Sequence, residues 1–305
     1  MNVRFYRKST PLAKQRDILV NFCQKINDGE VNAIVEDADR YIDCDVAVIF
    51  GSWKKSPKKK WKMMLAHHFL KAEIVNEHRG KLIVIETPLL NRTISDDGLH
   101  DQYRVGLNHF MRGLADFKNT NSKPDRFNKL NIDVKPWRKS GDHVLIVGQN
   151  LFDASLFGID FSYWVENTTK MLLKHTNRKI VIRDHPENKT ELKNYIEHKF
   201  GHISQVEYSN KGTIYDDLKN AHCTVSYTSG SSIDSIIAGV PVIPCSEYNF
   251  LWPISSHSLS EIENPKLGER EQLLYNLAYA QWSVQEIQKG KPWDHLYEYI
   301  SSHNI

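Results

Sequence analysis

The stretch AHCTVSYTSGSSIDSIIAGVPVIPC, residues 221–245, decides the fold. Its first part, Cys223–Tyr227, is a short β-rich run that fits one buried strand. A small polar turn follows, and Ile233–Ala238 then carries apolar residues at helical spacing until Gly239 ends the helix. Val240–Pro244 reads as a second strand. Strand, turn, helix and strand in this order predict a βαβ unit of a parallel sheet.

The turn between the strand and the helix has the composition of an anion site. It consists of Thr228, Ser229, Gly230, Ser231 and Ser232. Glycine lets the backbone approach a ligand closely, and amide groups at a helix start together with hydroxyl groups are donors for a phosphate. A plain strand-to-helix connection capped by serine explains the same residues, so both interpretations stay open.

Two further strands end in polar residues of ligand-binding type. HVLIVGQN, residues 143–150, ends in Gly148 and Gln149, and KIVIRDHP, residues 179–186, places Arg183 and His185 at its end. Open α/β sheets bind ligands at the carboxyl ends of their strands, and arginine and histidine both donate to phosphate. The alternative for the second stretch is a surface loop with a capping histidine.

The order of these three strand ends resembles the C-terminal half of GT-B glycosyltransferases. The likeness spans roughly residues 140–295 and is strongest to capsule-polysaccharide sugar transferases and phage-encoded glycosyltransferases. It implies that this half holds a nucleotide sugar, a UDP-sugar being the first candidate, with His185 and the turn 229–232 on the diphosphate side. Many GT-B enzymes place a Glu for the ribose where this chain has Asp234, whose shorter side chain also suits a helix-start carboxylate.

The resemblance and the strand pattern together predict an α/β protein with two Rossmann-like domains whose parallel sheets face a cleft. We expect an acceptor-binding domain at 1–139, a donor-binding domain at 140–275, and C-terminal helices at 276–305 that cross back to the first domain. Within these domains the pattern predicts an edge strand at Val3–Tyr6, a short helix around Tyr103–Asn108 and a continuous helix over Glu269–Ile287.

Composition fits a folded protein, with 40% apolar and 25% charged residues. We find no signal peptide and no apolar run long enough for a membrane span, and we expect a cytoplasmic protein. The four cysteines have no metal-site spacing, and no acidic motif at a strand end requires a metal. Residues 1–139 hold 26 Lys and Arg against 17 Asp and Glu, a net +9, whereas residues 140–305 carry −6, which points to an anionic partner for the first half.

A lysine-rich stretch follows the strand at Val46–Phe50. WKKSPKKKWK, residues 53–62, contains the lysines Lys54, Lys55, Lys58, Lys59 and Lys60 between the aromatic residues Trp53 and Trp61. Lysines bind phosphates without sequence preference and aromatic rings stack on unpaired bases, which predicts contact with DNA. A solvated loop followed by a helix start, with Trp61 in the core, is the competing interpretation.

The function predicted from these features is transfer of a sugar from a nucleotide sugar to a hydroxyl group. An inverting reaction needs a base for the acceptor proton, and the candidates are Asp97, Asp101 and Glu86, each of which also fits a turn or capping role. The basic half and the lysine-rich stretch favour DNA, and the resemblance to phage-encoded glycosyltransferases implies hydroxymethylated pyrimidines of phage DNA as acceptors. The alternatives are a polysaccharide or lipid-linked acceptor, a non-catalytic nucleic-acid-binding module, and a nucleotide-sugar epimerase.

Overall fold

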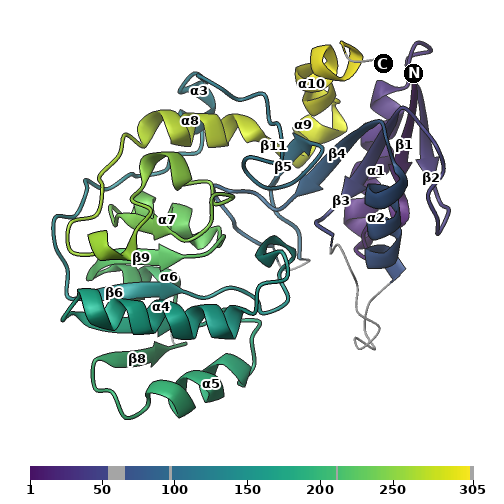
Figure 1. The fold of residues 1–305 in the computed structure, drawn as a ribbon. Helices are drawn as coiled ribbons and strands as arrows, with labels where there is room; N and C mark the ends of the chain where they lie inside the picture. Colours follow the sequence, from purple (N-terminus) through teal and green to yellow (C-terminus); the bar gives the residue numbers. More distant parts are fainter. Residues whose placement is uncertain (54–65, 96–97, 211, 303–305) are drawn as a thin grey trace. The chain divides into compact units, whose positions relative to one another are not determined.

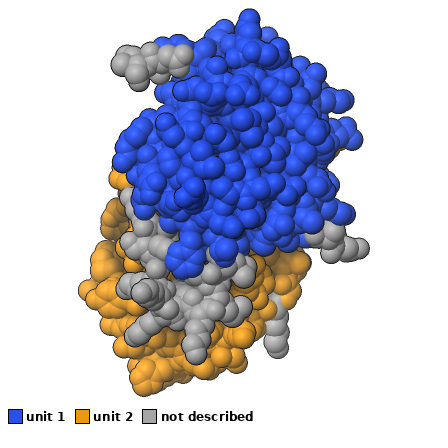
Figure 2. Space-filling model, turned by 90° about the vertical axis from the view of Figure 1, so that its right-hand side faces the viewer, with its two compact units in different colours: residues 1–130, 274–305 blue, residues 131–273 orange. Residues whose placement is uncertain are grey.

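The computed structural model describes residues 1–53, 66–95, 98–210 and 212–302 (Figure 1). The chain forms two compact units, which Figure 2 colours separately. Unit 1 contains Met1–Leu130 and Leu274–Ile305, and unit 2 contains Asn131–Leu273. Unit 1 therefore takes both ends of the chain.

Unit 1 is built on a six-stranded sheet in the order β11-β5-β4-β3-β1-β2. Its strands are β1 (Asn2–Tyr6), β2 (Asn32–Glu36), β3 (Val46–Phe50), β4 (Lys81–Glu86), β5 (Gln102–Leu107) and β11 (Gln281–Ser283). The four strands from β4 to β2 run parallel, whereas β5 and β11 pair antiparallel at the other side. The carboxyl ends of four strands consequently lie along one edge of this sheet.

Both faces of this sheet are covered. Val46, Val48 and Phe50 of β3 belong to a core that includes residues of the first helix and of the C-terminal helices. The alternate residues Ala47 and Ile49 are fully buried as well, as expected for a parallel strand with helices on both sides. The helices of this part are α1 (Ala13–Ile26), α2 (Ala66–Glu77), α3 (Asp125–Asn128), α9 (Val284–Gln288) and α10 (Lys291–Ser301), while α8 (Glu271–Ala280) contains the division between the units.

Unit 2 has a five-stranded, all-parallel sheet in the order β10-β9-β6-β7-β8. Its strands are β6 (His143–Val147), β7 (Lys179–Arg183), β8 (Val206–Ser209), β9 (Ala221–Ser226) and β10 (Val242–Pro244). Its helices are α4 (Phe161–His175), α5 (Glu191–Phe200), α6 (Ile214–Leu218) and α7 (Ser231–Ile237). Apolar residues of α4 and α5 pack on one face and Leu218 and Val240 on the other, which completes a Rossmann-like unit.

The structure confirms the predicted α/β class but corrects three local predictions. β1 is not an edge strand, because β2 and β3 pair with it on both sides. Residues 102–107 form the strand β5 instead of a short helix, since Tyr103 and Val105 alternate with polar Arg104. The expected helix over Glu269–Ile287 is interrupted by β11, whose Trp282 pairs with Tyr103.

Side chains near β11 hold the C-terminal segment against the rest of unit 1. Gln281 is fully buried, and its Oε1 accepts hydrogen bonds from the backbone N–H groups of Leu89 (3.1 Å) and Leu90 (3.0 Å). Arg126 donates to both carboxylate oxygens of Glu286 at 2.8 and 3.0 Å, and its guanidinium lies 4.4 Å from the centre of the Trp282 ring. These contacts join segments about half the chain apart.

No helix within the described residues is long and apolar enough to cross a membrane.

We predict that Gln281→Ala lowers the free energy of unfolding by about 1–3 kcal/mol, because two buried N–H groups lose their acceptor. Urea titration measures this change. Gln285→Ala is the matched control, since Gln285 is exposed on α9 and its replacement should change stability by less than about 0.5 kcal/mol. Equal effects of the two substitutions would contradict an anchoring role for Gln281.

Candidate functional site

The sheet of unit 2 reverses its direction of growth beside β6. The chain adds β7 and β8 on one side of β6 and then returns to place β9 and β10 on the other side. In open α/β sheets the crevice outside the carboxyl ends of the two strands at such a reversal is the usual ligand site. The residues that follow β6 and β9, together with those after the neighbouring β7, are therefore the candidate site.

The loops after β6 and β9 are joined by Gln149 and Thr228. Gln149 Nε2 donates to Thr228 Oγ1 (2.8 Å) and to Ser155 Oγ (2.7 Å), and the Thr228 N–H donates to Gln149 Oε1 (3.3 Å). Gln149 is only 2% exposed. Both residues were predicted as donor ligands, and the structure places them together, but their hydrogen bonds are made within the protein. They fix the two loops in position.

The loop after β7 approaches the β6 loop closely at Gly148. The Gly148 N–H donates to the Arg183 carbonyl oxygen (2.7 Å), and a Cβ at this position would collide with that oxygen. Asn188 then donates to the Gln149 carbonyl oxygen (3.0 Å) and to Asp184 Oδ1 (2.7 Å). The glycine is thus required by this close approach.

His185 has a nitrogen that is open to a ligand. The backbone N–H of Glu187 donates to His185 Nδ1 (3.2 Å), so the proton of the neutral ring is on Nε2. The side chain is half-buried, and within residues 1–53, 66–95, 98–210 and 212–302 no partner contacts Nε2. His185 therefore presents a hydrogen-bond donor at the carboxyl edge of the sheet, as a phosphate ligand requires.

Arg183, predicted to bind the diphosphate, is engaged with other parts of unit 2. Its Nη1 lies 2.6 Å from Asp217 Oδ2, and its Nη2 donates to the Gly212 carbonyl oxygen (2.8 Å). Asp217 also accepts a hydrogen bond from Ser209 Oγ (2.9 Å). These contacts tie β7 to β8 and α6, which is a structural use of the guanidinium.

The serine-rich turn satisfies several of its own donors. The Ser232 N–H and Oγ both donate to the Ser229 carbonyl oxygen (3.2 and 2.7 Å), and the Ile233 N–H donates to the Gly230 carbonyl oxygen (3.0 Å). Helix α7 has seven residues. The N–H groups of Ser232 and Ile233 are therefore used within the turn, and anion binding by residues 229–232 stays a prediction.

Two residues that the sequence reasoning missed support this turn. The buried Asn249, after β10, donates to the Tyr227 carbonyl oxygen (3.0 Å) and accepts from the Leu251 N–H (3.0 Å). Tyr215 of α6 donates its hydroxyl to Asp234 Oδ1 (3.2 Å) while its ring is largely exposed. Asn249 lies five residues after the end of β10, and no sequence pattern indicates either residue.

Candidate bases lie at the strand ends of unit 1. Glu86 ends β4, where its Oε1 accepts the Thr87 N–H (2.8 Å), and Arg104 is its register partner on β5. Asp101 immediately precedes β5. Asp97 lies outside the described residues.

His100 is a further candidate base that our assignment from the sequence omitted. Its Nδ1 bonds the Thr93 carbonyl oxygen (2.9 Å), which leaves Nε2 as the acceptor of a neutral ring. Burial lowers the pKa of His100, although the Thr93 carbonyl oxygen and the charges of Glu86 and Asp101 oppose this effect. The ring is therefore neutral at pH 7 and able to accept a proton.

The predicted DNA-binding stretch is described only at its first residue. Trp53 is 4% exposed and packs edge-on against His109 and Phe110, with ring centres 4.8 and 5.0 Å away. The Trp53 ring is therefore part of the buried core of unit 1. Lys54, Lys55, Lys58, Lys59, Lys60 and Trp61 lie outside the described residues.

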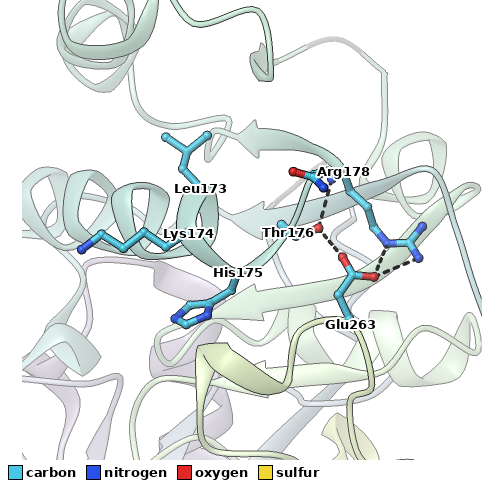
Figure 3. A pocket seen from close by; sticks show the side chains of 7 residues that line it. Leu173, Lys174, His175, Thr176, Arg178 and Glu263 are labelled. Carbon is cyan, nitrogen blue, oxygen red and sulfur yellow. Dashed lines mark hydrogen bonds and ion pairs between the residues drawn. The ribbon is translucent and has the colours of Figure 1, made fainter.

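A hollow of about 520 Å³ lies at the opposite edge of the unit 2 sheet (Figure 3). It is lined by the end of α4, the connection from α4 to β7 (residues 176–178) and Glu263. Arg178 pairs with Glu263 at 3.1 Å, and the Thr176 hydroxyl donates to the same carboxylate. The hydrogen bond from Thr176 and the charge of Arg178 lower the pKa of Glu263. Thr176, Arg178 and Glu263 are thus paired with one another, and none of the lining residues was predicted from the sequence, so this hollow is a weaker candidate.

Comparison with known proteins establishes the fold. No protein-family model matches the sequence, and no curated protein does. The solved structure of Thermosulfurimonas dismutans KpsC described as a β-Kdo 2,7 transferase matches with a TM-score of 0.51 and 12% identity, covering 95% of this chain and 98% of that one. The one described as a β-Kdo 2,4 transferase matches with a TM-score of 0.52 and 12% identity, covering 91% and 90%. The predicted GT-B fold is confirmed.

We predict that Arg183→Ala lowers the free energy of unfolding by about 1–3 kcal/mol, because Asp217 loses a charged hydrogen-bond partner. His185→Ala should change stability by less than about 0.5 kcal/mol, since its ring makes one bond in an exposed loop. Urea unfolding of both variants measures the difference. An Arg183→Ala protein as stable as the wild type would show that the ion pair contributes nothing to the fold.

Proposed function

We propose that the protein is a nucleotide-sugar-dependent glycosyltransferase whose donor binds at the carboxyl edge of the unit 2 sheet. The observation that carries this proposal is the joined set of three loops at the sheet reversal, with His185 Nε2 open beside them. The GT-B fold supports it. A UDP-sugar is the first donor to test, and the cytoplasm is the proposed location.

In this proposal His185 donates Nε2–H to the diphosphate, and the turn Ser229–Ser232 borders the same group. We propose that Asp234 and the exposed ring of Tyr215, which are joined by a hydrogen bond, contact the nucleoside. The bond from the acceptor oxygen to the anomeric carbon forms while the bond from that carbon to the phosphate oxygen breaks, and its electron pair leaves with the nucleoside diphosphate. Hydrogen bonds aimed at this developing charge lower the barrier.

The acceptor would bind on unit 1, where a base takes its hydroxyl proton in an inverting reaction. Glu86, Asp101, Asp97 and His100 are the proposed bases. Of these, His100 would accept the proton on its ring nitrogen Nε2, whereas the other three would accept it on a carboxylate oxygen. A metal is not required by this scheme.

The charge of unit 1 supports an anionic acceptor. Unit 1 carries 25 Lys and Arg against 19 Asp and Glu, a net +6, while unit 2 has 15 against 18, a net −3. We propose a hydroxymethylated pyrimidine of phage DNA as the acceptor, with Trp61 and the lysines of residues 54–60 near the DNA. The buried Trp53 is left out of this contact. A polysaccharide or lipid-linked sugar is the second candidate, supported by fold neighbours described as Kdo transferases.

We expect the protein to release a nucleoside diphosphate from one member of a panel of nucleotide sugars. Incubation with and without hydroxymethylated duplex DNA, followed by mass analysis, separates the acceptors, because only a DNA acceptor gains the mass of a sugar. Release without DNA dependence would favour a saccharide acceptor or an epimerase. No release and no donor binding, together with tight DNA binding, would favour the binding module.

The variant His185→Ala provides the sharper test of the donor site. Loss of a donor that faces the developing charge should slow release by roughly 100-fold or more. His198→Ala is the control, because His198 is exposed on α5 away from the strand ends. Unchanged turnover in His185→Ala would remove this residue from the donor site.

We predict that replacing Lys58, Lys59 and Lys60 with Ala weakens DNA binding and flattens its salt dependence. Each lost phosphate contact should reduce the slope of log K against log salt by about 0.9. Fluorescence anisotropy at several salt concentrations measures the slope. The same slope in the triple variant and the wild type would assign these lysines to the solvent.

A further inference from the structure

Unit 1 contains its own sheet reversal, and a cavity lies beside it. The chain places β2 on one side of β1 and β3 on the other, so β1 and β3 flank the position where ligands bind in such sheets. A cavity of about 220 Å³ is lined there by residues that follow β1 and β2 and by α1 and α2. Its polar lining comes from Lys8, Thr10, Arg16, Asp39 and His67.

The cations that line this cavity exceed its single carboxylate. Lys8 Nζ lies 3.0 Å from Asp39 Oδ1, an exposed contact of the kind that contributes little. Arg16 Nε donates to the Thr10 carbonyl oxygen (3.0 Å), and no carboxylate of the described residues pairs with the guanidinium. Arg16 therefore keeps guanidinium donors that are not engaged by a carboxylate of the described residues.

A buried ammonium group lies near the cavity. Lys71 is 4% exposed, and among the described residues its Nζ makes one hydrogen bond, to the Phe50 carbonyl oxygen at 3.3 Å. Nζ sits over Gly51, where a Cβ would come within 3.0 Å of it. Burial lowers the pKa of Lys71 to about 8, although the charge of Glu86 opposes this effect. The other two N–H donors of this ammonium group have no hydrogen-bond acceptor among the described residues.

The imidazole ring of His67 is exposed to the positive charges of Arg16 and Lys71. It lies one helical turn before Lys71 on α2 and lines the cavity. Burial and the charges of Lys71 and Arg16 lower its pKa to about 4. The amino end of α1, a helix of 14 residues with no acidic side chain in its first turn, adds partial positive charge at the same place.

We propose that this cavity binds a small anionic group, a phosphate monoester or a carboxylate, through Arg16 and His67 with Lys71 behind them. The volume is below the ~300–1,000 Å³ of pockets that enclose drug-sized ligands, so it suits one such group. A bound anion offsets the unpaired positive charge of Arg16 and Lys71 and turns His67 into a donor. The inference goes beyond the proposed function and does not depend on a nucleotide sugar.

The test follows the His67 ring by NMR while inorganic phosphate or, separately, acetate is added to the full chain. Binding should raise the pKa of His67, because an adjacent anion favours the imidazolium over the neutral ring. The charges of Lys71 and Arg16 act on this ring, and the His68 ring lies 4.2 Å from it, centre to centre. Lys8 and Asp39 line the same cavity. The shift should saturate with ligand concentration. The two arms distinguish a phosphate site from a carboxylate site.

Variants separate a built site from general attraction of anions. Arg16→Gln should weaken binding about 10- to 100-fold, as expected for loss of a charged hydrogen bond. Lys71→Met keeps the apolar stem and should also weaken binding. Lys25→Gln, in the last turn of the same helix, removes one positive charge away from the cavity and should leave binding unchanged.

A His67 signal that responds to neither anion would overturn the proposal, as would equal binding by Arg16→Gln, Lys71→Met and Lys25→Gln. Both results are obtained without a nucleotide sugar. They are therefore independent of nucleotide release, which tests the donor site on unit 2. A saturable response in the wild type that is lost in the two cavity variants supports the anion site.

Discussion

The constraint on which both candidate sites depend is that each sheet adds strands on both sides of its first strand. β1 lies between β2 and β3, and β6 lies between β7 and β9. Connections leave such a pair of strands in opposite directions, which opens a crevice at their carboxyl ends. Unit 2 joins the two loops with the bonds between Gln149 and Thr228, whereas unit 1 has a cavity with cationic lining at the corresponding place.

The sequence predicted the central parallel strands well and the antiparallel strands poorly. β3, β6 and β7 each contain a short, continuous apolar run bounded by polar residues, a pattern typical of a buried strand in a parallel sheet. β5 and β11 were assigned to helices. Three residues such as Gln281–Ser283 carry no periodicity of their own, and their pairing with β5 depends on a segment about 180 residues earlier in the chain.

For the candidate site, residue types and strand ends could be predicted from the sequence, but the partners of each side chain could not. Gln149, Arg183 and His185 all follow strands and all suit a phosphate. Gln149 bonds to Thr228 and Arg183 to Asp217, which come from other parts of the chain, whereas Nε2 of His185 has no partner in the part of the chain that the structure describes. The roles of Asn249 and Tyr215 could not be predicted from the sequence, because they depend on contacts with residues that are distant in the chain.

Long-range and local electrostatics have different origins in unit 1. Its net +6 equals the six lysines of residues 54–62, so the remainder of unit 1 is neutral overall. Attraction of a polyanion therefore depends on that stretch and should weaken as salt screens exposed charges beyond about 8–10 Å. The field at His67 comes instead from Arg16 and the buried Lys71. Because buried charges are screened less, anion binding in the cavity should persist at salt concentrations that abolish binding through the lysine stretch.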